Sequence, residues 1–277
     1  MSKSHLYMTR QLAQFVVVAA SFVICICCSG GSDETSPANT PAKTNTDRGN
    51  DIMAEFLKRD AAPFRKDRVR FTINEEGSDQ KVYEIETTRR QQPDETRTLT
   101  EIVSPPEESG LGSLVIEAKD KPATVTTYSV SRGDFRETGT EKTFFGGLSA
   151  GELLGEWDKF DYHLTDEKST PSGDVYEIEG KLKQGATSAA SRLTAVVAKD
   201  TLLPVELHFF DASGQEIRTY RVTEIKNAGG RPYPARTEVD NPVYHAHIVI
   251  EILKREFPAN VDDQTFERDK LKQIVKK

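Results

Sequence analysis

The stretch RVRFTIN, residues 68–74, decides the fold because apolar and polar side chains alternate along it. In an extended strand Val69, Phe71 and Ile73 point to one face, while the polar residues between them point to the other. After a turn rich in acidic residues and glycine, residues 81–87 continue the same alternation. The pattern predicts a β-hairpin with one apolar face and one solvated face.

The same period of two recurs along most of the remaining chain, interrupted by turn-forming residues such as those at 211–214 and 227–230. Many strands at short spacing, few helices and no alternation of strand with helix predict a mainly β (α+β) domain with a large antiparallel sheet or barrel. The further predicted strands cover residues 97–103, 113–118, 123–130, 175–183, 192–198, 204–210, 216–225, 235–239 and 245–253.

Two segments have helical rather than strand periodicity. Residues 51–65 place apolar side chains at helical spacing, and Pro63 disturbs the end of this segment. Ser149 is the expected N-cap of a second, short helix that runs through Leu153 towards Trp157. An apolar helix at this position would suit packing against the concave side of a curved sheet.

Composition and charge limit the classes of function. The chain has 277 residues, 36% of them hydrophobic and 29% charged, and its net charge is -7. This size suits one globular domain with appendages. The acidic balance argues against nucleic-acid binding, which needs a concentrated basic face.

The N-terminus has the pattern of a secretory signal. Lys3 and Arg10 precede an almost wholly apolar run at 15–28, which predicts a signal peptide over residues 1–27. An ordinary cleaved signal and an uncleaved membrane helix are the alternatives. The apolar stretch at 12–28 is at the lower limit of about 17 residues that a membrane-spanning helix needs.

All three cysteines, Cys25, Cys27 and Cys28, lie at the end of this apolar run. Disulfides among them would close trivially small loops, and a metal site lacks further ligands nearby. The run resembles instead a bacterial lipoprotein signal, in which Cys28 is lipidated and becomes the new N-terminus. The Ser-, Thr- and Pro-rich stretch at 28–50 then predicts a flexible tether, and residues 51–277 form the folded domain without cysteine.

No motif nominates a catalytic residue, a metal site or a cofactor. The glycines Gly146, Gly147 and Gly151 lack the following lysine and the parallel sheet of a phosphate-binding loop. His245 and His247 are expected on the solvated face of a strand, and no spacing supplies a third metal ligand. The sequence therefore predicts a protein that is not an enzyme.

The order of several landmarks resembles the LolA-like outer-membrane lipoprotein-sorting family, which shares a fold with LolA, LolB, RseB and MucB. The likeness runs from about residue 51 to the C-terminus. Its landmarks are the first helix and hairpin, the strand–proline–glycine–strand segment at 103–116, Phe145-Gly146 before Glu152-Leu153, the segment at 204–214, Gly230-Arg231-Pro232 and the segment at 262–271.

This resemblance implies an unclosed antiparallel β-barrel, curled around a few short helices, with an apolar cavity for acyl chains. It implies a protein of the bacterial envelope that receives or transports a lipid or an acylated lipoprotein. Together with the lipoprotein signal at Cys28, this predicts a monomer that faces the periplasm and is anchored in the outer membrane. The alternative is a non-catalytic envelope sensor or protein-interaction module with a filled core. The expected cavity residues are Phe71, Ile73, Leu114, Ile116, Leu153, Trp157, Leu207, Phe209, Ile248 and Ile250.

Overall fold

The chain divides into two units, residues 1–41 and 42–277. The computed structural model describes residues 43–274 apart from 120, 142 and 144. The expected signal peptide, the three cysteines and the greater part of the expected tether lie outside the described residues. The following description concerns the second unit.

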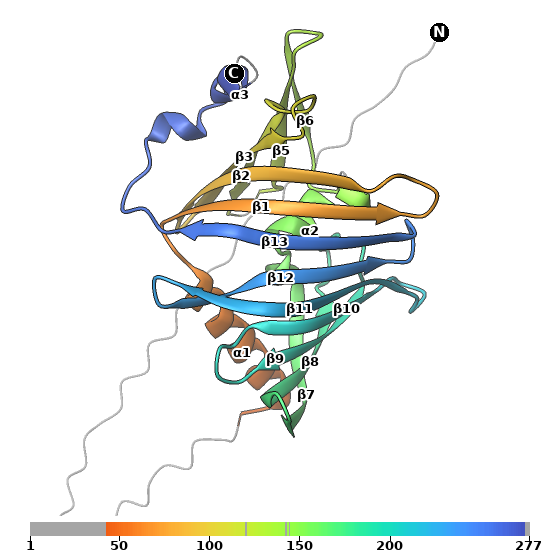
Figure 1. Ribbon diagram of the computed structural model, residues 1–277. Helices are drawn as coiled ribbons and strands as arrows, with labels where there is room; N and C mark the ends of the chain where they lie inside the picture. Colours follow the sequence, from red (N-terminus) through yellow and green to blue (C-terminus); the bar gives the residue numbers. More distant parts are fainter. Residues whose placement is uncertain (1–42, 120, 142, 144, 275–277) are drawn as a thin grey trace, which may run out of the picture. The chain divides into compact units, whose positions relative to one another are not determined.

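Thirteen strands form one antiparallel sheet in the order β6-β5-β4-β3-β2-β1-β13-β12-β11-β10-β9-β8-β7 (Figure 1). The sheet bends strongly but does not close, because the order ends at β6 and β7. The predicted mainly β, antiparallel and unclosed architecture is thereby confirmed. The strands are β1 (Phe64–Glu75), β2 (Lys81–Gln92), β3 (Glu95–Ser104), β4 (Gly112–Ala118), β5 (Thr124–Ser129), β6 (Asp134–Thr138), β7 (Phe160–Thr170), β8 (Gly173–Leu182), β9 (Arg192–Ala198), β10 (Pro204–Phe210), β11 (Glu216–Ala228), β12 (Arg231–Asn241) and β13 (Ala246–Glu256).

The predicted hairpin is β1 and β2, in a register that pairs Val69 with Ile85 and Phe71 with Tyr83. Both strands continue beyond the apolar alternation, since Arg65 lies directly opposite Arg89. The sequence pattern missed this extension because its inward-facing residues are charged.

Two strands were not predicted, β6 and β7. In β7 only Phe160, Tyr162 and Leu164 are buried, and every residue of its second half is exposed. Pairing with β8 holds that polar half in the sheet, so periodicity alone gives no signal for it.

Helix α1 (Asn45–Asp60) begins earlier than the expected residue 51, because Thr44 caps it in a reciprocal capping box with Asp47. Residues 45–50, which the sequence assigns to the tether, are therefore helical. The helix packs against β7, the last strand of the sheet, and Asn50 Oδ1 accepts a 2.9 Å hydrogen bond from the Tyr162 backbone N–H. The helix thus covers the end of the sheet at β7.

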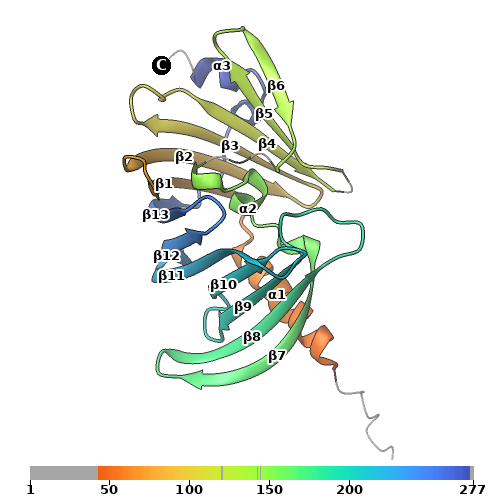
Figure 2. The same ribbon diagram turned by 90° about the vertical axis from the view of Figure 1, so that its right-hand side faces the viewer.

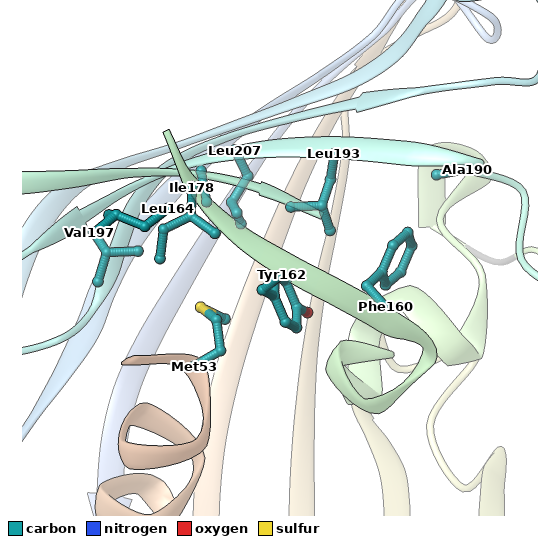
Figure 3. Packing of buried hydrophobic residues seen from close by; sticks show 10 residues of the cluster. Met53, Phe160, Tyr162, Leu164, Ile178, Ala190, Leu193, Val197 and Leu207 are labelled. Carbon is teal, nitrogen blue, oxygen red and sulfur yellow. The ribbon is translucent and has the colours of Figure 1, made fainter. Parts of the chain in front are cut away.

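A cluster of buried side chains joins α1 to the strands β7 to β10 (Figure 3). Met53 projects from the helix towards Leu164 and Ile178, and each of the three is at most 2% exposed. Burying a side chain of this size contributes roughly 1.5–3 kcal/mol. The apolar face of the helix is therefore core, as its spacing predicts.

Helix α2 (Ala150–Leu154) lies in the bend of the sheet (Figure 2). Ser149 is its N-cap, as predicted, and Glu152 completes the capping box. The helix ends at Gly155, so Trp157 belongs to a separate short 3-10 helix, η2 (Trp157–Lys159). Before α2, the 3-10 helix η1 (Phe145–Gly147) crosses β1 and β13.

The C-terminal segment packs on the outer face of β3, β4 and β5. It contains η3 (Asp263–Phe266) and α3 (Lys270–Ile274). Leu271 and Ile274 are each 1% exposed and form a cluster with Leu99 and Leu114. The convex face of the sheet therefore has an apolar layer of its own at this end.

Candidate functional site

A cavity of about 870 Å³ lies between the concave face of the sheet and the helices α1 and α2. Ligand-binding cavities typically measure about 300–1,000 Å³. Its apolar lining consists of Phe56, Val69, Phe71, Ile73, Tyr83, Ile85, Ile102, Leu111, Val115, Val125, Phe145, Leu153, Trp157, Phe160, Leu193, Leu203, Leu207, Phe209, Ile217, Tyr220, Val222, Ile250 and Ile252, among others.

The strand alternation that predicts the fold also builds the wall of this cavity. Val69 of β1 lies opposite Ile85 of β2, and Ile85 lies opposite Ile102 of β3. Side chains two residues apart on a strand share a face, so Phe71 and Tyr83, which lie opposite each other, also point into the cavity. The result is a continuous apolar floor across neighbouring strands.

Phe145 of η1 covers part of this floor. Its ring stacks on Phe71, with centroids 4.7 Å apart, and lies 5.0 Å from the ring of Tyr83. The Tyr83 hydroxyl donates to Glu108 at 3.1 Å, and desolvation together with this carboxylate raises the pKa of Tyr83. The aromatic group thus joins a loop to the hairpin at one end of the cavity.

Trp157, the single tryptophan of the chain, lines another part of the wall. Its ring meets Phe56 of α1 edge to face, with centroids 5.6 Å apart, and its backbone carbonyl accepts a 2.8 Å hydrogen bond from the Tyr162 hydroxyl. The indole therefore lies in the cavity wall, where a quencher bound in the cavity can contact it.

Charged side chains form the end of the cavity near the start of β1. Arg255 donates two hydrogen bonds to Asp67, at 2.8 and 2.9 Å, and both side chains are at most 7% exposed. Arg65 pairs with Asp67 and with Asp60, each at 3.1 Å. Arg255 and Arg65 thus each have a carboxylate at close range, although the buried Nε of Arg65 forms no hydrogen bond among the described residues.

The third arginine, Arg89, has much weaker partners. Its single ion pair is with Asp60 at 3.9 Å, and its buried Nε has no hydrogen-bond partner in the described part of the chain. The hydroxyl of Thr98, directly opposite on β3 and 8% exposed, is likewise buried without a partner there. Desolvation, followed by the nearby Arg65 charge, lowers the pKa of Arg89.

Seven of the ten expected cavity residues line the cavity: Phe71, Ile73, Leu153, Trp157, Leu207, Phe209 and Ile250. Leu114 and Ile116 do not, because they occupy the outer face of β4 and pack with the α3 cluster. Ile248 points to the inner face but lies beneath η1, where its Cδ1 would be 2.7 Å from a Cβ at position 146. Phe145 and the arginine cluster were not expected.

The histidine and glycine motifs occupy structural positions. His247 lies 2.7 Å from Asp240 at the surface, and His245 precedes β13 in a turn with a positive φ. Gly146 also has a positive φ, and its carbonyl accepts a 2.8 Å hydrogen bond from Asn241. Among the described residues no three metal-ligating side chains come together.

Within residues 43–274, excluding the three undescribed positions, no helix combines the length and the apolar character needed to cross a membrane.

Comparison with known proteins identifies the fold. A DUF1329 family protein from Desulfovibrio piger superposes with a TM-score of 0.76 at 20% identity, covering 83% of this chain and 100% of the other. A domain described as an outer membrane lipoprotein-sorting protein, from Vibrio parahaemolyticus, gives 0.73 at 14% identity, with 82% and 99% covered. A LolA superfamily protein from Nitrosomonas europaea gives 0.64 at 14% identity, with 80% and 98% covered.

At such identities the likeness shows the fold alone, and that fold is LolA-like. At the level of sequence, a family model described as an uncharacterized protein matches residues 94–273. No curated protein matches the chain.

Proposed function

The chain belongs to the family whose model matches residues 94–273 and has a LolA-like fold, and on this premise we propose that its concave cavity binds acyl chains of a lipid or a lipoprotein. The single observation that carries the proposal is the cavity of about 870 Å³ with its apolar floor. A module with a filled core would have no such space. Burial of a hydrocarbon chain there contributes about 0.8 kcal/mol for each methylene.

The composition of the cavity wall supports a role in transporting or receiving a ligand rather than in catalysis. The aromatic and aliphatic walls offer burial, which a carrier needs, and the fold is shared with a domain described as lipoprotein-sorting. Because a fold alone does not determine a function, the proposal depends on the cavity and requires a direct binding measurement.

The test uses Trp157 as the reporter. A dibrominated stearic acid titrated into the purified protein is expected to quench the fluorescence, since bromine quenches an indole on contact and Trp157 lines the cavity. Thr100→Phe places a larger side chain in the cavity wall and should reduce the quenching. The matched control, Glu86→Phe, lies on an exposed part of the neighbouring strand and should leave it unchanged.

Native mass spectrometry of the protein purified from membranes provides an independent readout. A co-purifying acyl lipid is the expected result. A protein that carries no lipid, and whose fluorescence no brominated chain quenches, would refute acyl-chain binding.

We further propose that the protein is anchored in the bacterial envelope by lipidation of Cys28, facing the periplasm. The cysteine-containing signal pattern and the polar stretch that follows it support this location. Radiolabelled palmitate should label the wild-type protein but not Cys28→Ala, and the variant should leave the membrane fraction. An unlabelled wild-type protein would refute the anchor and leave the binding proposal intact.

A further inference from the structure

The cavity changes in polarity along its length, in rows of side chains that cross the strands. One row contains Val69, Ile85 and Ile102. Two residues towards the start of β1, the next row contains Asp67, Thr87 and Thr100, and the following row contains Arg65, Arg89 and Thr98. All these residues line the cavity.

The rows are spaced as the extended strand dictates. Each residue advances the strand by about 3.3 Å, so neighbouring rows are roughly 7 Å apart. An amphiphile with its head at the row of Arg89 would therefore place its first carbons at the hydroxyl row and the rest of its chain over Val69, Ile85 and Phe71. The order of polarity in the wall matches that of a single-headed amphiphile.

The arginine row contains one guanidinium, that of Arg89, with no carboxylate at close range in the described part of the chain. Arg65 and Arg89 face each other directly across two strands, an arrangement that is unfavourable for like charges. Three arginines and two aspartates line this end of the cavity, Arg255, Arg65 and Arg89 against Asp67 and Asp60. Glu117 of β4 also acts electrostatically on Arg89, but the single ion pair of Arg89 is with Asp60, at 3.9 Å, so this guanidinium has no carboxylate at hydrogen-bonding distance among the described residues.

Three buried polar atoms of this row have no hydrogen-bond partner among the described residues: Arg65 Nε, Arg89 Nε and Thr98 Oγ1. Arg65 has an ion pair with Asp67 at 3.1 Å, whereas Arg89 has no ion pair this close in the part of the chain that the structure describes, and Thr98 is 8% exposed. A buried polar group without a partner is costly, typically by about 1–3 kcal/mol. A guanidinium also matches a carboxylate or a phosphate with paired donors.

We propose that Arg89 and Thr98 bind the anionic headgroup, a carboxylate or a phosphate, of an amphiphile whose hydrocarbon chain lies on the apolar floor of the cavity. This assignment rests on the proposed function and narrows it to one class of ligand. A neutral diacylglycerol-type group would leave Arg89 without an acceptor of matching charge at hydrogen-bonding distance, so the cavity selects acids over their esters.

The experiment compares dibrominated stearic acid with its methyl ester, using quenching of Trp157. The wild-type protein is expected to bind the acid about tenfold more tightly than the ester. A difference of this size is typical of one charge-assisted hydrogen bond that the acid forms and the ester lacks. Equal affinities for acid and ester would overturn the headgroup assignment while leaving acyl-chain binding intact. Absence of quenching by either probe would instead refute the proposed function itself.

Two variants test which residues give the preference for the acid over the ester. Arg89→Gln and Thr98→Val should each weaken binding of the acid and leave binding of the ester unchanged. Thr98→Val removes an unpaired hydroxyl from a buried position, so this variant is expected to fold. The matched control, Arg68→Gln, removes an arginine from the outer face of the same hairpin, where it pairs with Glu84, and should behave as wild type.

A competition experiment separates an amphiphile from a free anion. Inorganic phosphate at the same concentration as the acid should not displace it, because phosphate gains nothing from the apolar floor. Displacement by phosphate alone, or a preference for the acid that persists in both variants, would overturn the proposal.

Discussion

Arg218 of β11 lies 2.8 Å from Glu152 of α2, and these side chains are only 5% and 14% exposed. The same guanidinium donates a 2.8 Å hydrogen bond to the Gly147 carbonyl oxygen. One arginine of the sheet therefore fixes both the short helix and the glycine turn, which together cover the inner face.

Arg218→Met is expected to lower the free energy of unfolding by about 3–5 kcal/mol, because it leaves the Glu152 carboxylate buried without its cation. Urea denaturation measures the change. Arg221→Met on the same strand is the control, since its pair with Glu206 is exposed and 3.6 Å long; a loss below about 1 kcal/mol is expected there. Similar losses in both variants would contradict the role given to Arg218.

Gly49→Ala should destabilise the protein although alanine is the better helix former by about 1 kcal/mol. A Cβ at position 49 would come within 2.8 Å of the β7 backbone at Tyr162, His163 and Leu164. The helix would have to move away from the strand. Thermal unfolding is the readout, and a higher Tm for Gly49→Ala would show that α1 does not pack this closely.

Ala54→Gly, at an exposed position of the same helix, is the matched control. Here ordinary helix propensity applies and a loss of about 1 kcal/mol is expected. Gly49→Ala is thus expected to destabilise the protein by a steric clash with β7, and Ala54→Gly by the conformational freedom of glycine in the unfolded chain.

Leu114→Ala should separate stability from binding. Leu114 is 2% exposed and packs with Leu271 on the outer face, so its truncation is expected to cost about 2–5 kcal/mol. Quenching of Trp157 by the brominated acid should be unchanged in the folded variant. A matching loss of affinity would place Leu114 in the binding site after all.

Glu117→Gln should change how stability depends on pH. Burial, the largest cause, raises the pKa of Glu117 above its ordinary value of 4.5, so the folded protein keeps this proton to a higher pH than the unfolded chain. Stability consequently falls as pH rises from 4.5 through the folded-state pKa. The variant should be more stable than wild type at neutral pH and equal to it well below 4.5. Denaturation of both proteins at several pH values measures this, and a difference in the free energy of unfolding that stays the same at every pH would exclude this explanation.

The fold was largely predictable because most strands alternate and the turn residues between them are distinctive. The N-cap at Ser149 was also predicted from its own segment, and the structure confirms it. In contrast, both faces of β4 are covered, so alternation could not tell whether Leu114 or Val115 points into the cavity. Only the position of α3, far along the chain, settles that the larger side chains face outward.

The polar end of the cavity was not predictable for a different reason. Arg65, Asp67 and Arg89 have the composition of a solvated face, and nothing in their own segments indicates burial. The strand register places Arg255 opposite Asp67 from the other end of the chain. Phe145 was missed similarly, because its partner Phe71 is distant in sequence and its own segment has no periodicity.

The cover that α1 places over β7 has a consequence for association between molecules. At the other end of the sheet, the outer side of β6 has no strand partner among the described residues. At the β7 end, Asn50 of α1 accepts a hydrogen bond from the Tyr162 backbone N–H, so the helix occupies the place where a further strand would pair with this part of β7. At the β6 end, the charges of Asp134, Arg136 and Glu137 along this short strand disfavour pairing with a strand of a second copy, so helix and charge limit edge-to-edge association at different ends of the sheet.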